Sequence, residues 1–354
     1  MFFQSIHYFR AIAIFLVVLS HCNTIGRWEP TTFADSFIFA LVRNVTVYFV
    51  FIAGFLFHHI YIAKRPFNYR KFLTKRLLFV ALPYGILAGS ASLYSVLTGD
   101  WPPHTPEGLG NWPVVLFAWF MATGRVFVAY WYIPMAILIY LSSPLWIALA
   151  RSRYIVPILG VGLAISSFIH RPDDDLNPLH ALVYFAPIYL LGMTVSTHRD
   201  RVFRAIVRYR WGLLAAGLLL GIAQVMWMGS GNSFVKDFDE IFVFQGIDIN
   251  LFQKIFLCLF LLSILQTLEQ TKIKWLSLVA DTSFPIYFIH PLLLTLSHQQ
   301  FFHGRVQNLL AFLHWQGHLP GVLAIAVVLT ATSMAIALGL KRLLGDRSRY
   351  LIGW

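Results

Sequence analysis

The chain has 354 residues, of which 58% are hydrophobic and 12% charged, and its formal net charge is +12. Soluble domains are about 45–50% apolar and about 25% charged, so this composition excludes an ordinary soluble protein and predicts a polytopic membrane protein. In such a chain an excess of Lys and Arg indicates cytoplasmic loops, and we expect no nucleic-acid partner.

Ten stretches are apolar and long enough to cross a bilayer, which takes about 20 residues in a helix. We therefore expect an all-α membrane helix bundle of about ten transmembrane helices, with residues 1–354 forming one domain. A shorter apolar piece at 112–123 is predicted to be a re-entrant or interfacial helix. The expected spans are residues 6–24, 36–62, 77–98, 129–150, 154–170, 179–196, 211–229, 251–268, 276–298 and 320–341.

The loops between these spans differ in charge on the two sides of the membrane. Acidic runs at 173–175 and 237–240 fall on one side, and most of the 27 Lys and Arg residues fall on the other. By the positive-inside rule, this asymmetry predicts that both termini are cytoplasmic. The basic clusters are residues 64–76, 151–153, 199–210, 272–274 and 341–349.

The first span, residues 6–23, combines an apolar sequence with Arg10 and His21. A charge at the bilayer centre costs about 2.5–3.5 kcal/mol on insertion scales, so such residues normally face a bundle interior or a wet cavity. Arg10 and His21 are separated by about three helical turns, or ~16 Å along the axis, and by only ~20° around it. We expect both side chains to face one cavity.

Two other spans carry polar side chains at a depth similar to that of His21. These are Arg43 in the second span and His290 in the ninth. A single shared cavity would satisfy all of them, whereas the alternative is that each is bonded separately to backbone or neighbours. We predict that Arg43 and His290, together with Tyr287 and Trp131, bind the substrate.

His21 is the candidate general base or, alternatively, a relay that carries the acyl group transiently. An imidazole titrates near neutral pH, and a hydroxyl becomes a good nucleophile only when a base within hydrogen-bond reach takes its proton. Arg10 is predicted to hold an anionic donor or to stabilise developing negative charge. The alternatives are a structural histidine bonded to a carbonyl and an arginine that extends to the lipid headgroups.

Five segments together resemble the acyltransferase-3 family of integral membrane acyltransferases. The first is the Arg10 and His21 pair, since an Arg, ten residues and a His are typical of the first span of that family. The resemblance covers essentially the whole chain in the right order. The other segments are VYFVFIAGFLF at 47–57, FLTKRLLFVALPY at 72–84, YWYIPMAILIYL at 130–141 and SFPIYFIHPLLL at 283–294.

Three positions depart from the family's pattern. Ala53 stands where a Ser is usual, and Phe284 stands where a Tyr is usual. The third departure concerns the donor site, because Arg76 matches the first Arg of an Arg-x-x-Arg motif while Phe79 takes the place of the second. Lys75 and Arg70 are the candidates to substitute for that second cation.

A basic stretch at 63–76 contains six Lys and Arg residues. Such clusters suit phosphate groups, which Arg binds bidentately. The resemblance implies an acyl-coenzyme A donor, so we predict that its phosphates bind to Arg76, Lys75 and Arg70 in this loop. The alternative is an ordinary cytoplasmic loop that contacts anionic lipid.

The resemblance implies transfer of an acyl group, commonly acetyl, from acetyl-CoA to a hydroxyl of a bacterial exopolysaccharide or other surface glycan. It further implies the bacterial cytoplasmic (inner) membrane, with membrane lipids, a glycan or lipid-linked glycan acceptor, and polysaccharide-assembly proteins as partners. We expect no metal, because the His residues of the last loop lack the close spacing with carboxylates that a zinc site prefers. These are His298, His303, His314 and His318.

Two other functions remain open at this level. A transporter or flippase for a glycan or lipid-linked sugar would use intramembrane Arg and His residues as a substrate or proton pathway. Such proteins often contain inverted repeats with paired broken helices, and the sequence shows no internal repeat. A glycan polymerase or ligase would act without coenzyme A.

Overall fold

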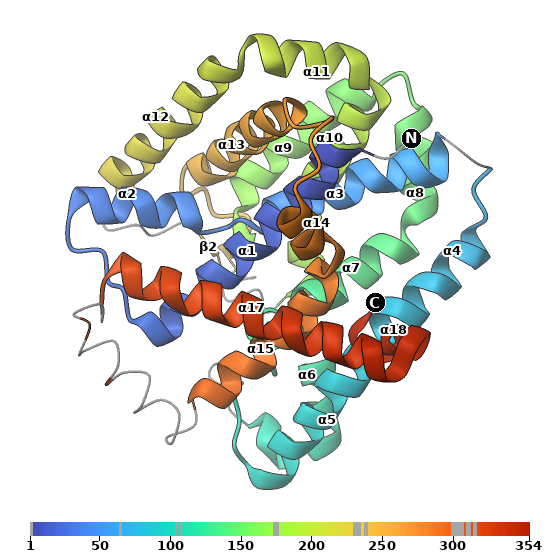
Figure 1. Ribbon diagram of the computed structural model, residues 1–354, viewed down its shortest axis with the longest axis vertical. Coiled ribbons are helices and arrows are strands. Elements are labelled where there is room, and N and C mark those ends of the chain that lie inside the picture. The colour runs from blue at the N-terminus through green and yellow to red at the C-terminus, as the bar shows by residue number, and fades with distance from the viewer. Residues whose placement is uncertain are drawn as a thin grey trace.

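The computed structural model describes residues 3–63, 66–102, 105–106, 108–172, 177–228, 235–236, 240–298, 308, 313 and 317–354. It is a bundle of helices, which confirms the all-α prediction (Figure 1). The short strands β1 (Arg171–Pro172) and β2 (Val235–Lys236) pair in parallel. The predicted charges at 64–65, 173–175, 237 and 239, and residues His303 and His314, lie outside the described residues.

Seven helical runs of the described chain are long and apolar enough to cross a membrane, and nine if each of two bent helix pairs counts as one span. They coincide with nine of the ten predicted stretches. The remaining stretch, predicted at 154–170, forms α9 (Ile155–Ile169), which has only 15 residues. The piece predicted to be a short helix forms α6 (Pro113–Thr123), of 11 residues. The chain is therefore a multi-pass membrane protein.

The helical runs are described by their bounds. The long ones are α1 (Gln4–Gly26), α2 (Phe33–Val42) with α3 (Thr46–Phe57) and η1 (His58–Ile62), α4 (Tyr69–Arg76) with η2 (Leu77–Ala81) and α5 (Leu82–Thr98), α10 (Pro178–Thr197), α12 (Arg210–Met228), α13 (Ile249–Gln266), and α17 (Leu319–Leu344) with η6 (Gly345–Ser348) and α18 (Arg349–Ile352). The bent pairs are α7 (Tyr132–Leu141) with α8 (Ser143–Arg151), and α14 (Lys274–Asp281) with α15 (Ser283–His298). Shorter elements are η3 (Leu109–Asn111) and α11 (Arg199–Arg208).

Both bends occur where a proline opens the second helix. The angle is 62° between α7 and α8 and 69° between α14 and α15. Pro144 and Pro285 lie in the first turn of α8 and α15. A proline there lacks an N–H and clashes with the carbonyl four residues earlier, so the preceding helix cannot continue through it. The second bend places Ser283, the first residue of α15, beside α1.

The second predicted span is broken, which corrects the expectation of one continuous helix over 36–62. The helix stops after Val42 because Asn44 adopts a left-handed backbone conformation, with φ 57°. The freed carbonyls of Ala40 and Leu41 accept hydrogen bonds from Lys254 Nζ at 2.5 and 3.0 Å. A break at membrane depth is tolerated when protein groups satisfy the backbone in this way.

Helix α1 lies at the centre of the bundle, with α3, α13, α14, α15 and α17 packed around it (Figure 1). Its first turn is held by the Glu269 carboxylate, which accepts from the N–H groups of Gln4 and Ser5 at 2.9 Å each. A carboxylate suits the positive end of a helix dipole. This contact fixes the position of α1 along its axis, and hence the depth of Arg10 and His21.

Helices α3 and α10 approach each other to backbone contact. A Cβ atom at Gly54 would lie 2.0 Å from the Tyr189 carbonyl oxygen, and one at Gly192 would lie 2.0 Å from that of Phe51. Small residues permit such close packing between membrane helices. The close packing anchors α3, whose residues Thr46 and Phe49 line the cavity described next.

Candidate active site

A cavity of about 440 Å³ lies among α1, α3, α4, η2, α7, α15 and α18. This volume is within the range of roughly 300–1,000 Å³ that small-molecule sites occupy. Its walls are mostly aromatic and aliphatic, but they contain Arg10, Arg76 and Arg349, while no carboxylate side chain is found among the described lining residues. The cavity therefore suits a ligand that is partly apolar and carries negative charge.

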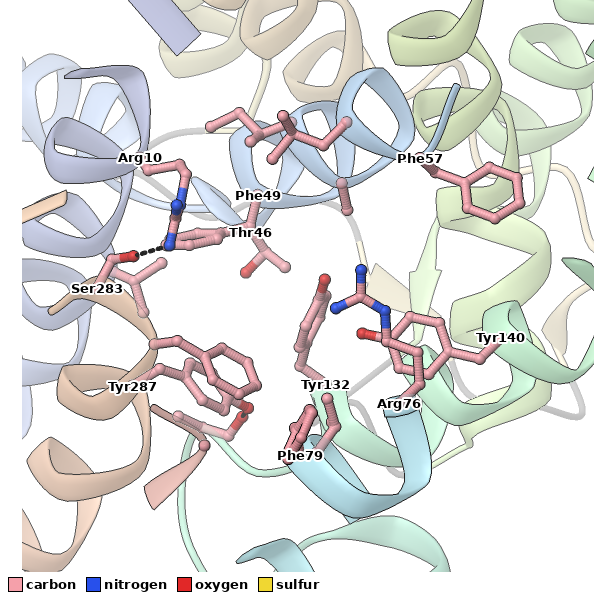
Figure 2. A pocket seen from close by; sticks show the side chains of 18 of the residues that line it. Arg10, Thr46, Phe49, Phe57, Arg76, Phe79, Tyr132, Tyr140, Ser283 and Tyr287 are labelled. Carbon is pink, nitrogen blue, oxygen red and sulfur yellow. Dashed lines mark hydrogen bonds between the residues drawn. The ribbon is translucent and has the colours of Figure 1, made fainter. Parts of the chain in front are cut away.

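Arg10 extends from α1 into this cavity. Its guanidinium donates a hydrogen bond of 2.9 Å to Ser283 Oγ. Figure 2 shows this pair on one side of the cavity and Arg76 on the other, with the Tyr132 ring between them. The proline-linked bend before Ser283 thus positions the hydroxyl that orients Arg10.

Arg76, the last residue of α4, is held by aromatic rings. Its guanidinium lies 5.5–5.7 Å from the ring centroids of Tyr61, Phe72 and Tyr140. It also donates a long hydrogen bond of 3.4 Å to the Tyr61 hydroxyl, while its buried Nε has no hydrogen-bond partner among the described residues. Cation–π contacts position a guanidinium without using all its donors, so Arg76 retains capacity for an anionic ligand.

His21 and His290 form a directional hydrogen-bond chain. Nδ1 of His290 lies 2.9 Å from the Ile286 carbonyl oxygen, and a carbonyl only accepts, so this Nδ1 carries the proton. Nε2 of His290 is then the acceptor for Nδ1–H of His21, 3.2 Å away. In neutral His21 the basic lone pair therefore belongs to Nε2. The rings are nearly parallel, 8° apart, with centroids at 5.5 Å.

The structure brings several other predicted residues to the cavity. Trp131 and Tyr287 line it together with Arg10, Arg76 and His21. Trp131 stacks on Phe185 with its centroid 5.7 Å away, and the Tyr287 hydroxyl donates to the Ala129 carbonyl. His290 is fully buried behind His21 and is not among the lining residues.

Arg43 lies elsewhere, which differs from the expectation of one shared cavity. It follows the last residue of α2, at the break in the second span, and its guanidinium stacks over Phe39 at 5.1 Å. It borders a separate, much smaller cavity of about 10 Å³ with Trp28 and Asn23. The helix break redirects the chain at this point, and a helical projection through 36–62 could not have shown it.

Arg70 and Lys75 are exposed and do not line the cavity. The segment predicted to be a basic loop is helical from Tyr69 onward, where α4 begins. On a helix Lys75 points ~100° away from Arg76, and Arg70 points ~120° away, so only one of the three can face the cavity. The helix therefore directs Arg70 and Lys75 away from the cavity that Arg76 lines, whereas a flexible loop would have let all three side chains bind one ligand.

Sequence reasoning missed Tyr61, Tyr132, Tyr140, Ser283 and Arg349. Tyr132 and Tyr140 are eight positions apart in one apolar run, a spacing that places both on one helix face. That repetition was a usable signal. Tyr61 and Phe79 lie in the π-helical segments η1 and η2, whose wider turns shift side chains relative to an α-helix. No pattern in the sequence signals those shifts.

A sequence model of a family described as an acyltransferase domain (Acyl_transf_3) matches residues 3–338. The chain belongs to the acyltransferase-3 family. Neither a curated protein nor a solved structure matches it.

The acyltransferase-3 assignment agrees with the geometry of the cavity. Each of the five segments that resemble the family contributes lining residues, although the segments are far apart in the chain. The protein is thus a membrane acyltransferase. Among the described residues, no group of three or more His, Cys, Asp or Glu side chains is arranged to hold a metal ion. Examples of the lining residues are Val17, Ala53, Phe79, Tyr132 and Phe284, one from each segment.

Proposed function

We propose that this acyltransferase moves an acetyl group from acetyl-CoA to a hydroxyl of a bacterial exopolysaccharide or other surface glycan. The observation that carries the proposal is one cavity that holds His21, a histidine of defined tautomer, together with Arg10 and Arg76. Arg10 donates to one neutral partner, the Ser283 hydroxyl, and Arg76 has a buried Nε with no hydrogen-bond partner among the described residues. A base for the acceptor and cations for a phosphorylated donor are what this reaction needs.

The donor lies along the cavity, with its phosphates near Arg76 and its thioester near His21. Helix α1 is continuous from Gln4 to Gly26, so Arg10 and His21 are separated by ~16 Å along its axis. Arg10 is therefore too distant to stabilise an oxyanion formed beside His21, and it serves the donor instead. The extended pantetheine arm of coenzyme A suits the largely aromatic cavity between Arg10 and His21.

The chemical step requires two proton transfers, one from the acceptor hydroxyl to His21 and one from His21 to the leaving thiolate. Nε2 of His21 takes the proton of the acceptor hydroxyl as its oxygen bonds to the acyl carbon. The carbon–sulfur bond then breaks, and His21 returns the proton to the departing thiolate. His290 holds the His21 ring in place and, through the Ile286 carbonyl, fixes which nitrogen is basic.

Phe79, Arg349, Gly353 and Trp354 line the cavity and are half-buried, so we infer that the cavity reaches the surface at this end. If both termini are cytoplasmic, as the charge asymmetry predicts, this end opens to the cytoplasm, where acetyl-CoA is found. The protein then belongs in the bacterial inner membrane. The acceptor, a glycan or lipid-linked glycan, is presented directly or by a polysaccharide-assembly protein.

Two measurements test the proposal. Purified protein in lipid nanodiscs should release coenzyme A thiol from acetyl-CoA when supplied with deacetylated surface polysaccharide. Mass spectrometry of surface glycan from cells with and without the protein should show the loss of an acetyl mass. A protein that neither binds nor consumes acetyl-CoA would contradict the donor assignment, and an unchanged glycan would contradict the acceptor assignment.

A further inference from the structure

The second cation of the Arg-x-x-Arg pattern is absent from this chain, because Phe79 stands in its place. The structure shows what lies there instead. The guanidinium of Arg349, from the C-terminal helix α18, lies over the Phe79 ring with its centre 5.5 Å from the ring centroid. A cation thus occupies the space next to position 79, although it comes from the other end of the chain.

Arg349 reaches this place because the chain turns back after α17. Through η6 it enters α18, which packs against η2 and α5 and lies beside them in Figure 1. Tyr350 packs on Phe79 with ring centroids 5.9 Å apart. Gly353, with φ 75°, permits the close approach, since a Cβ there would lie 2.4 Å from the Phe284 ring and 3.0 Å from the Phe79 carbonyl oxygen. The segment follows residue 338, where the family match ends.

The donors of Arg349 are only partly used. One terminal nitrogen donates to the Asp346 carboxylate at 2.9 Å, while the buried Nε has no hydrogen-bond partner among the described residues. The side chain lines the same cavity as Arg76. Asp346 is highly exposed, with 86% of its side chain accessible, so solvent weakens that ion pair and leaves the guanidinium able to bind another anion.

We propose that Arg349 is a donor-binding residue, which together with Arg76 binds the phosphate groups of the acyl donor at the mouth of the cavity. The inference rests on the proposed function, since it presupposes a phosphorylated donor. Arg349 supplies from α18 the cation that η2 lacks at Phe79. Arginine suits this role because its planar fork both stacks on an aromatic ring and binds phosphate oxygens.

The test compares the affinity of purified variants for coenzyme A and for pantetheine, which lacks every phosphate group. Arg349→Gln should weaken coenzyme A binding about tenfold, the effect of one charge-assisted hydrogen bond, and leave pantetheine binding unchanged. Arg347→Gln is the matched control, because Arg347 is exposed, lies two positions from Arg349, and its substitution removes the same charge. Adding Phe79→Arg to Arg349→Gln should restore part of the lost affinity.

Each result decides between distinct conclusions. If wild type and Arg349→Gln bind coenzyme A equally, Arg349 is not a donor-binding residue, while the proposed function stands. If Arg349→Gln loses coenzyme A and pantetheine alike, Arg349 only packs against Phe79 and the inference fails. If the wild type binds no coenzyme A, the proposed function fails and this inference fails with it.

A measurement on the wild-type protein covers the case in which Arg349→Gln does not fold. Coenzyme A, but not pantetheine, should protect Arg349 from modification by phenylglyoxal, as read by mass spectrometry of the C-terminal peptide. Arg347 in the same peptide should be modified equally with and without ligand. Equal modification of Arg349 in both cases would overturn the inference.

Discussion

Arg76 and Lys254 are both cations inside the apolar bundle, but their surroundings differ. Lys254 is completely buried and its ammonium donates to the Ala40 and Leu41 carbonyls at the end of α2. Arg76 is surrounded by aromatic rings, has a buried Nε with no partner among the described residues, and borders a cavity of about 440 Å³. The first cation stabilises a broken helix, whereas the second is available to a ligand.

The neighbourhoods of these two cations extend the contrast. Around Lys254, the amide of Asn250 links Gln224, Gln253 and Asn44 through hydrogen bonds of 2.7–3.0 Å. Around Arg76, the neighbours are rings and open space. A buried polar group that the protein satisfies, such as the Lys254 ammonium, gains nothing from a ligand, whereas the partly satisfied Arg76 guanidinium beside a cavity does. The difference shows that intramembrane charge alone does not identify a binding site.

Removing His21, the proposed base, should produce the largest effect on the cavity side of this comparison. His21→Ala should reduce acetyl transfer at least ~100-fold, because general base catalysis contributes 10²–10⁴-fold. The rate is measured as thiol release from acetyl-CoA with deacetylated glycan. The control is His198→Ala, since His198 is exposed just after the end of α10 and its Nδ1 lies 3.2 Å from the Thr194 carbonyl oxygen. Wild-type transfer by His21→Ala would show that the base lies elsewhere.

Removing the cavity cation should weaken donor binding next most strongly. Arg76→Gln should raise the KM for acetyl-CoA about tenfold or more, since hydrogen bonds to charged groups contribute roughly 1.5–3 kcal/mol. Its matched control is Lys75→Gln, which removes the same charge from an exposed neighbour and should change KM less than about twofold. Equal effects of the two substitutions would show that general electrostatic attraction, rather than a specific site, binds the donor.

Changing His290 tests whether it acts through His21. His290→Phe removes the acceptor for His21 Nδ1–H and should lower kcat about tenfold, typical of a residue that orients another. His290→Gln keeps a side-chain acceptor near that position and should recover part of the loss. The KM for acetyl-CoA should stay constant in both, because His290 is not among the cavity-lining residues. A raised KM with unchanged kcat would place His290 in donor binding.

Lys254→Met should affect activity least and stability most. Methionine fills similar volume but leaves the two α2 carbonyls without their donor, at a cost of about 1–3 kcal/mol each in unsatisfied polar groups. The expected result is a lower thermal unfolding midpoint in detergent, with the KM for acetyl-CoA unchanged in the folded fraction. A changed KM with an unchanged midpoint would remove the distinction between the two cations.

The chain pattern predicted much of the fold. Nine of the ten apolar stretches form runs that are long enough to span, because length and hydropathy alone decide whether a helix suits a bilayer. The same pattern failed at Asn44, where a left-handed residue breaks the second span. It also failed at α4, where a stretch of basic residues reads as a loop but forms a helix.

The candidate site was predictable where a single helix carries it. Arg10 and His21 share one continuous helix, so their spacing fixes their relation. Arg76 was identified by resemblance to a family motif, and Trp131 and Tyr287 by the segments around them. The predicted location of Arg43 was wrong because it depends on the helix break after α2. The carbonyls freed by that break accept hydrogen bonds from Lys254, which is more than 200 positions away in the chain.

The sequence by itself determined that this chain crosses the membrane many times, that it resembles an acyltransferase, and that Arg10 and His21 face the same way. These properties depend on local composition and on the repeat of a helix, which neighbouring residues fix together. Only the tertiary structure decided that His290 orients His21, that rings surround Arg76, and that Arg349 lies over Phe79. Those contacts join residues up to 270 positions apart, and packing of the whole bundle sets them.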